Sequence, residues 1–372
     1  MCPASEDIAD ADAIANTNTT TNTNTNTNTN ASVMFAPPVQ SHIGNLAVAA
    51  ASYGGLQLTP SLQAVSGAPL KSAVANFSAG RICAGPIPML IRIAPDVRLF
   101  VDIEGPAWVP DGPRLREKPS LLLLHGGPGY DHSSFKPIFS RLADIAQIVY
   151  IDHRGHGRSD ARPAAEWTLD TFADDVVRLC DALGIARPIV LGQSFGGFVA
   201  QRYLARHPAH PAKVVLSSTS HHMGLPRKLA MFEQLGGPAA RAAAEAFWRA
   251  PSAATWASYN LHCRDLYNTQ PADPIARQRT LMNEDILFTS AGGEQQTMQL
   301  LPGLAGVQCP VLVMAGEQDP VTPLADAQDI AAAIPAPWGR LVTFPNAGHG
   351  AWRDEPDAAM AVLREFITAP AE

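Results

Sequence analysis

The sequence predicts an α/β fold: an open, mostly parallel sheet of about eight strands, with helices on both faces and one helical insertion. Two observations predict it. From residue 88 onward short aliphatic runs recur, and the segments between them carry apolar residues at helical spacing. The runs are aliphatic along their whole length, which is typical of strands in a parallel sheet that is buried on both faces.

The first elements are expected to be strands. Residues 89–93 and 97–103 alternate in polarity around Pro95-Asp96, which predicts a hairpin, and a proline-rich loop follows from Pro106 to Pro119. Beyond the loop, strands and helices are expected to alternate, with strands at 120–124, 146–151, 188–191 and 213–217 and helices at 135–145, 169–183 (ended by Gly184) and 195–206.

Residues 221–301 show helical patterns only. Helices are expected there at 227–235, 239–249, 253–263 and 274–283, and strand and helix then resume at 311–315, 323–334, 341–344 and 357–367. We therefore expect residues 85–220 and 309–372 to form the core. Residues 221–308 are expected to form a helical cap over the carboxyl edge of the sheet, where ligand crevices open in such folds.

The first 84 residues are expected to be a leader outside the fold. Residues 16–30 are almost entirely Asn and Thr, which offer no apolar side chains to bury, so this tract predicts disorder. Either a flexible tail or a start codon assigned too far upstream, with Met34 or Met89 as later candidates, would explain it. A β-aggregating segment is the alternative.

Charge and cysteine content bear on partners and compartment. Lys and Arg total 27 against 34 Asp and Glu, a formal charge of −7, and no basic run could neutralise a phosphate backbone, so nucleic acid is not expected as a partner. No apolar run is long enough to span a membrane. The odd number of cysteines and the acidic N-terminus argue against a disulfide framework and a secretory leader, and we expect a cytoplasmic protein.

A nucleophile is predicted at Ser194. Residues 192–196 are Gly-Gln-Ser-Phe-Gly, a G-x-S-x-G sequence that stands directly between an aliphatic strand and a helix. This is the context of a nucleophile elbow, in which the glycines permit a strained turn that exposes the hydroxyl at the end of the strand.

A base and an acid follow that serine in the expected chain order. Asp319 and His349 each come just after one of the last two expected strands. Because parallel strands end at one edge, both are expected beside Ser194, with His349 as general base and Asp319 orienting the imidazole. Glu317 is the rival acid, and it leaves its strand too early.

Backbone amides for an oxyanion are expected after strand 120–124, where residues 125–129 are His-Gly-Gly-Pro-Gly. We assign the amides of Gly127 and Phe195 to the oxyanion hole, with Gly126 as the substitute for Gly127. His125 comes too early in the chain order to be the base, and it is interpreted as a brace of the loop.

From about residue 88 to its end the sequence resembles an α/β-hydrolase. The His-Gly-Gly-Pro-Gly loop resembles that of the proline iminopeptidase family, as do residues 152–159 (D-x-R-G-x-G-x-S) and the acid loop at 316–323. The sequence departs from that family at Phe195, where Trp or Tyr is typical, and at His153 and His156, where Gln and Cys are commoner.

The resemblance implies a serine hydrolase that needs no cofactor. Release of an N-terminal proline or similar residue from a short peptide is placed first, and esterase or lactonase action on a small acyl compound is the alternative. An amine needs carboxylates in an enclosed site, and the candidates are Glu284, Asp285 and Glu294, which a solvated helix face explains equally well. Trp256 and Tyr259, at i and i+3, are expected to share a helix face and to roof the pocket.

Individual sequence features argue against metal or cofactor binding and against a different nucleophile. No H-E-x-x-H sequence and no Gly-rich phosphate loop occur, and the adjacent His221 and His222 are expected to point apart, so no metal or cofactor is expected. Ser194 itself argues against an aspartate-nucleophile epoxide or halide hydrolase. A non-catalytic binding module of the same fold is the remaining alternative. The expected partner is a small molecule or a short peptide.

Overall fold

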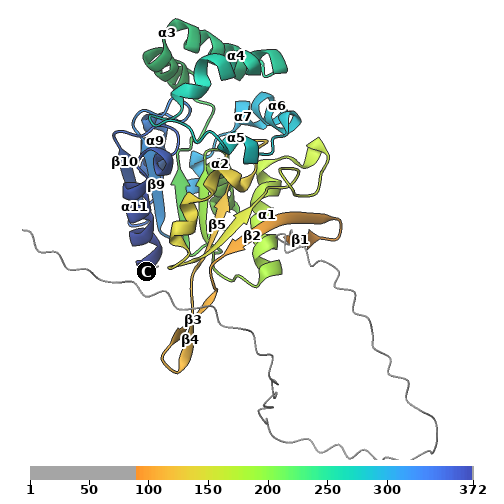
Figure 1. The fold of residues 1–372 in the computed structure, drawn as a ribbon, viewed down its shortest axis with the longest axis vertical. Helices are drawn as coiled ribbons and strands as arrows, with labels where there is room; N and C mark the ends of the chain where they lie inside the picture. Colours follow the sequence, from red (N-terminus) through yellow and green to blue (C-terminus); the bar gives the residue numbers. More distant parts are fainter. Residues whose placement is uncertain (1–88, 371–372) are drawn as a thin grey trace, which may run out of the picture. The chain divides into compact units, whose positions relative to one another are not determined.

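The computed structural model describes residues 89–370, so the expected leader at 1–84 lies outside the described residues. Eight strands form one sheet in the order β1-β2-β6-β5-β7-β8-β9-β10, and β3 and β4 form a separate hairpin (Figure 1). The strands are β1 (Met89–Ala94), β2 (Val97–Glu104), β3 (Trp108–Asp111), β4 (Arg114–Glu117), β5 (Ser120–Leu124), β6 (Gln147–Ile151), β7 (Ile189–Gln193), β8 (Lys213–Ser217), β9 (Val311–Gly316) and β10 (Gly339–Phe344).

The predicted fold class is confirmed. The pairs from β6 through β5, β7, β8 and β9 to β10 are all parallel. The β1–β2 and β2–β6 pairs of the same sheet are antiparallel, the first of them as the predicted hairpin requires. Alternate residues of the central strands enter two separate apolar clusters, for example Leu122 and Leu124 on one face and Leu121 and Leu123 on the other. Both faces of the sheet are therefore buried, which is why the strands are aliphatic throughout.

Helices cover both faces of the sheet. The cluster on one face includes α1, α2, α8 and α9, and the cluster on the other includes α10, α11 and the 3₁₀ turns η1 and η2. The helices are α1 (Leu169–Leu183), α2 (Phe195–Arg206), α3 (Leu225–Arg249), α4 (Ala253–Cys263), α5 (Ala276–Arg279), α6 (Glu284–Gly292), α7 (Glu294–Thr297), α8 (Leu301–Leu304), α9 (Leu324–Ala333), α10 (Ala351–Asp354) and α11 (Pro356–Thr368).

Three local predictions are wrong. The helix expected at 135–145 is two 3₁₀ turns, η1 (His132–Phe135) and η2 (Ile138–Leu142), because Pro137 interrupts any α-helix there. The proline-rich loop from Pro106 to Pro119 contains the β3-β4 hairpin. The helix expected at 274–283 is only the short α5.

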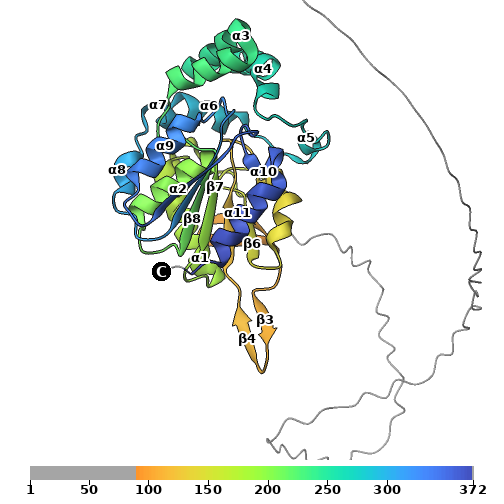
Figure 2. The same ribbon diagram turned by 90° about the vertical axis from the view of Figure 1, so that its left-hand side faces the viewer.

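The helical segment at 221–308 is built around its own apolar cluster. Helices α3, α4 and α6 contribute to that cluster, and α3 is interrupted by a kink at Gly237, whose φ is 72°, followed by Pro238. Figures 1 and 2 show α3 and α4 beyond the end of the sheet, on the side where β7 and β8 end. That this segment acts as a cap stays a prediction.

Among the helices within residues 89–370, none is both long enough and apolar enough to cross a membrane.

Candidate active site

Ser194 occupies a strained turn at the carboxyl end of β7. Its φ is 55° and its ψ is −115°, a conformation that L-residues rarely adopt, and α2 begins at the next residue. The two glycines of the motif make the turn possible. A Cβ added to Gly196 would lie 2.1 Å from the carbonyl oxygen of Leu124, and one added to Gly192 would lie 2.3 Å from that of Gly196. Ser194 is 8% exposed.

The predicted acid and base are in contact. Asp319 follows β9 and His349 follows β10, and His349 Nδ1 lies 2.8 Å from Asp319 Oδ2. Asp319 also accepts bonds from the Thr322 hydroxyl (2.6 Å) and from the amides of Val321 and Thr322. Burial by itself would raise the pKa of Asp319, but His349 and these donors outweigh it and hold the pKa of Asp319 below its ordinary value. Asp319 is therefore an anion that can orient the imidazole.

The serine lies at the same edge as this pair. The Ser194 amide donates to the Ser217 carbonyl (3.0 Å), and the Gly350 amide, next to His349, donates to the Ser218 hydroxyl (2.9 Å). Both residues are thus tied to the end of β8. Within residues 89–370 no hydrogen bond joins the Ser194 hydroxyl to His349. Hydrogen bonds between catalytic groups often form fully only when substrate is bound.

Glu317, the rival acid, is directed elsewhere. It is exposed, and its carboxylate accepts a bond from the Thr343 hydroxyl on β10 (2.9 Å). In the structure, therefore, it is Asp319 that contacts His349.

The predicted oxyanion loop lies against the nucleophile. A Cβ added to Gly126 would lie 3.3 Å from the Ser194 Cβ, and Gly126 and Gly127 are both partly exposed. As the first residue of α2, Phe195 has an amide without a partner in a preceding helical turn. The contact with Ser194 is made by Gly126, and the assignment of the Gly127 and Phe195 amides to an oxyanion hole stays a prediction.

His125 braces this loop from beneath. Its Nε2 accepts a bond from the His153 amide (3.1 Å), so its Nδ1 carries the proton and donates to the Gly126 carbonyl (2.8 Å). The ring is fully buried and packs against His153 and His156. Burial lowers the pKa of all three imidazoles, that of His156 to about 3, so they are neutral at pH 7.

A clamp that the sequence did not reveal holds the His349 loop. The Tyr267 ring packs edge-on against the His349 ring (centroids 5.4 Å apart), and the Tyr267 carbonyl accepts a bond from the His349 amide. Asn268 donates to the His349 carbonyl (3.3 Å) and to Asp354 (3.2 Å), which also accepts from the Gly348 amide. The helical segment thus positions the candidate base.

Comparison with known proteins identifies the family. Residues 119–356, more than half of the chain, match the family model described as the alpha/beta hydrolase fold. The chain belongs to the α/β-hydrolase family. A proline iminopeptidase of Lactobacillus helveticus (strain DPC 4571) is 28% identical to it over 273 residues, which cover 68% of this chain and 90% of that protein.

Solved structures agree with the fold of an α/β-hydrolase. The proline iminopeptidase structure from Mycobacterium smegmatis covers 75% of this chain and 97% of its own, with a TM-score of 0.61 and 24% identity. An esterase from Exiguobacterium antarcticum covers 76% and 100%, with a TM-score of 0.56 and 20% identity. At these identities the likeness is one of fold.

A second tie connects the helical segment of this α/β-hydrolase to the acid loop. Lys228, on α3, is 1% exposed and donates from Nζ to the carbonyl of Val321, two residues after Asp319. Its ammonium also lies 5.6 Å from the Trp248 ring centroid. Burial lowers the pKa of Lys228. No sequence signal pointed to this residue, because its partner is far away in the chain.

The three candidate carboxylates for a substrate amine lie in different surroundings. Glu284 and Asp285 are exposed in the first turn of α6 and line a groove with Gly155 and Gly157. Their helix abuts the oxyanion loop, because the Asn283 amide donates to the Gly129 carbonyl (2.8 Å). Glu294 accepts a bond from the Leu169 amide (2.8 Å) at the start of α1, which gives it a structural role.

The two predicted pocket aromatics are part of the apolar cluster of the helical segment. Trp256 and Tyr259 stack with their centroids 5.6 Å apart, so they share a helix face as predicted. Tyr259 is fully buried, and its hydroxyl lies 2.8 Å from that of Tyr267. Tyr259 is therefore linked to the site through Tyr267, whose ring packs against His349.

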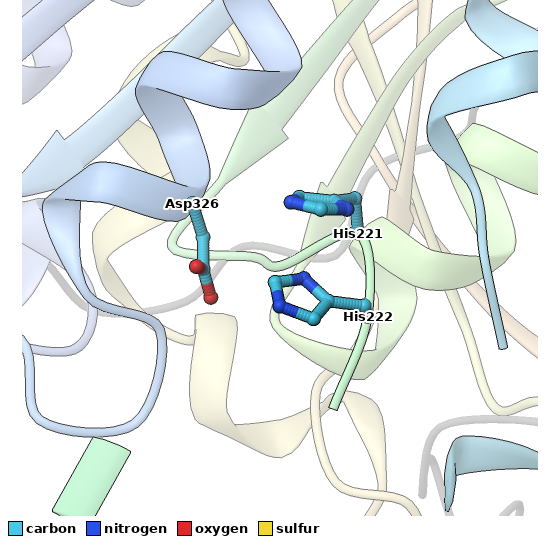
Figure 3. A group of neighbouring side chains, drawn as sticks. All are labelled: His221, His222 and Asp326. Atoms are coloured by element: carbon cyan, nitrogen blue, oxygen red, sulfur yellow. The ribbon is translucent and has the colours of Figure 1, made fainter. Parts of the chain in front are cut away.

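One histidine cluster elsewhere has metal-ligand composition. The rings of His221 and His222 lie 4.0 Å apart, centroid to centroid, so the prediction that they point apart is wrong; Figure 3 shows both beside Asp326. One ligand atom from each of the three lies within 4.8 Å of the others. However, Arg227 Nη1 lies 2.6 Å from Asp326 Oδ1, and a divalent cation would have to compete with that guanidinium.

Proposed function

We propose that this protein is a serine hydrolase that cleaves an acyl compound through Ser194, His349 and Asp319. The observation that carries the proposal is the strained Ser194 at the carboxyl end of β7, at the sheet edge where His349 contacts Asp319. A backbone held at φ 55° for a non-glycine residue is costly, and such strain persists where it presents a side chain for chemistry.

In the proposed reaction, the Ser194 hydroxyl adds to the substrate carbonyl as His349 Nε2 takes its proton. Asp319 holds Nδ1 of the ring and stabilises the imidazolium that forms. The amides of Gly127 and Phe195 donate to the oxyanion, and the imidazolium then protonates the leaving group as the acyl bond breaks. Water then adds to the acyl-serine carbonyl as His349 takes one of its protons. The imidazolium returns that proton to the Ser194 oxygen as the acyl–oxygen bond breaks, which frees the acid and restores the serine.

Labelling with a fluorophosphonate tests this proposal without a known substrate. The unchanged chain should be phosphonylated at Ser194, and S194A should not be labelled while its circular dichroism stays unchanged. Ser140 provides the control, because it lies in η2, on the face of the sheet opposite α2, and S140A should therefore be labelled normally. Absence of label on folded, unchanged protein would support the non-catalytic binding module instead.

For the substrate, we propose first the release of an N-terminal residue from a short peptide. Two observations support it: the His-Gly-Gly-Pro-Gly loop, and the carboxylates of Glu284 and Asp285 at the start of α6, where the amide of the preceding Asn283 donates to the Gly129 carbonyl of that loop. The relatives named proline iminopeptidase add support. Esterase or lactonase action is the second candidate, favoured by the exposure of these two acids and the structural role of Glu294.

Three substrates separate these candidates. A peptidase that binds the amine should hydrolyse prolyl-naphthylamide, fail on its N-acetyl form, and lose activity in the double variant E284Q/D285N. An esterase should prefer p-nitrophenyl butyrate and be indifferent to that double variant. Faster turnover of the N-acetylated than of the free amide would exclude the peptidase proposal.

A further inference from the structure

Arg264 stands out among the arginines of this chain. Of those within residues 89–370, fifteen form an ion pair, and five of the six others are exposed. Arg264 is the remaining one: it is half-buried and has no carboxylate partner among the described residues. Because Arg264 is half-buried rather than fully buried, part of the residue remains accessible to a ligand.

The position of Arg264 relates it to the active site. Its guanidinium lies 5.7 Å from the ring centroid of Tyr130, the residue that directly follows the oxyanion loop, and 5.0 Å from that of Tyr267. The Tyr267 ring in turn packs against His349. Arg264 is thus held between Tyr130, which follows the oxyanion loop, and Tyr267, which packs against the proposed base.

Two aromatic rings hold the cation but do not neutralise it. Cation–π contacts stabilise a guanidinium and leave its planar N–H groups available for a bidentate acceptor. The buried carboxylate of the same region, Asp354, is already taken by neutral donors, namely Asn268, the Gly348 amide and the Gln270 amide. The site therefore has a charge without a partner, in a protein whose formal charge is −7.

We propose that Arg264 binds a carboxylate group of the substrate. The inference rests on the proposed hydrolase function and narrows its substrate class to acyl compounds that carry an anionic group. The carboxylate can belong to the acyl part, as in a dicarboxylic acid hemi-ester, or to the leaving group, as at the C-terminus of a short peptide. The shared chemistry is a carboxylate that meets a guanidinium fork near the scissile carbonyl.

Two matched ester pairs test the proposal. For the acyl side, mono-4-nitrophenyl adipate is compared with its methyl ester; for the leaving side, 4-(butyryloxy)benzoate is compared with its methyl ester. The measured quantity is the ratio of kcat/KM for the charged ester to that for the neutral one. In R264Q this ratio should fall by about tenfold to a hundredfold in the pair that matches the true substrate, the loss expected for one charge-assisted contact. R264K keeps the positive charge but lacks the planar pair of N–H donors, so its ratio should lie between those of the unchanged chain and R264Q.

Arg277 provides the matched control, because it too has no carboxylate partner within residues 89–370 but is exposed on α5; R277Q should leave the ratio unchanged. The proposal is overturned if R264Q alters neither ratio, or if R277Q alters them as much. Fluorophosphonate labelling of Ser194 is followed in parallel. Failure of labelling in the unchanged chain refutes the hydrolase itself, whereas normal labelling with unchanged ratios refutes only the role of Arg264.

Discussion

At the residue scale, the backbone conformation of Ser194 costs stability while it presents the proposed nucleophile. Its φ of 55° and ψ of −115° suit glycine and penalise any residue that has a Cβ. The serine is therefore held there by the contacts around it, including the close approach of α2 to β5 that only Gly196 permits. Replacing the serine removes the nucleophile in every case, but the replacements should differ in stability.

We predict that S194G is more stable than S194A by about 1–3 kcal/mol in its free energy of unfolding, because glycine adopts this conformation without strain. Urea denaturation of both variants measures the difference. At Ser140, in ordinary 3₁₀ conformation, the order should be reversed, with S140G less stable than S140A by about 0.5–1 kcal/mol. An S194G protein that is weaker than S194A would show that the turn is unstrained.

The choice between the two candidate acids gives a second prediction at this scale. D319N should lower kcat by roughly 10⁴-fold, because an amide at this position favours the wrong tautomer of His349. E317Q should change kcat less than about threefold, since its carboxylate only contacts Thr343. The kcat of both variants on whichever test ester or amide the unchanged chain hydrolyses provides the readout, and similar losses in both variants would contradict the assignment.

At the element scale, the loop that carries His349 is positioned from outside the core. A Cβ added to Gly348 would lie 2.2 Å from the Tyr267 carbonyl oxygen, so the loop and the segment after η4 (Arg264–Leu266) are in close backbone contact. The His349 amide bond to that same carbonyl fixes the loop further. The geometry of the base therefore depends on a segment between two helices.

We predict that G348A lowers kcat/KM by about tenfold to a hundredfold, because a shift of the base by a fraction of an ångström to one ångström is costly in this chemistry. The thermal midpoint should fall less than the activity does. G306A is the matched control, since a Cβ there would meet nothing within 4 Å. Full activity in G348A would mean that the loop can move away from Tyr267 without displacing His349.

The elements also show what the sequence could and could not predict. The strands and α1, α2 and α4 were predictable because their aliphatic runs, helical periods and Gly184 are local signals. The 3₁₀ turns were not predictable from the apolar spacing at 135–145, which is that of a helix, although Pro137 interrupts any α-helix there. Asp319 and His349 could be placed beside each other because parallel strands end at one edge. Tyr267, Asn268, Lys228 and Arg264 could not, because no local pattern marks a contact such as that of Asn268 with His349, 81 residues apart.

At the scale of the whole molecule, the buried histidines link stability to pH. Burial, and repulsion from neighbouring imidazoles, lower the pKa values of His125, His153 and His156 in the folded protein and hold these side chains neutral. In the unfolded chain each titrates near its ordinary value of about 6.5. Below that pH the unfolded state binds more protons than the folded state. The free energy of unfolding is therefore undiminished by these histidines above about pH 6.5, and it declines as the pH falls below that value.

We predict that the free energy of unfolding falls between pH 7 and pH 5, by up to about 1.4 kcal/mol per pH unit for each buried imidazole. The slope should be smaller in H156Q, which removes one of the titrating groups. Urea titrations at pH 7, 6 and 5 measure both slopes. The lowered pKa of Asp319 acts at more acid pH, below about 4, and does not interfere in this window. Equal slopes in both proteins would contradict the prediction.

The bond from Lys228 to Val321 has a consequence for any attempt to transplant specificity between relatives. Residues 221–308 supply an ammonium to the acid loop and a tyrosine and an asparagine to the loop of the base. A chimaera that received this stretch from another hydrolase would keep every residue of the sheet and still lose the supports of its own imidazole and carboxylate. Such chimaeras should recover turnover only when the grafted stretch keeps Lys228, Tyr267 and Asn268 of this protein at the corresponding positions.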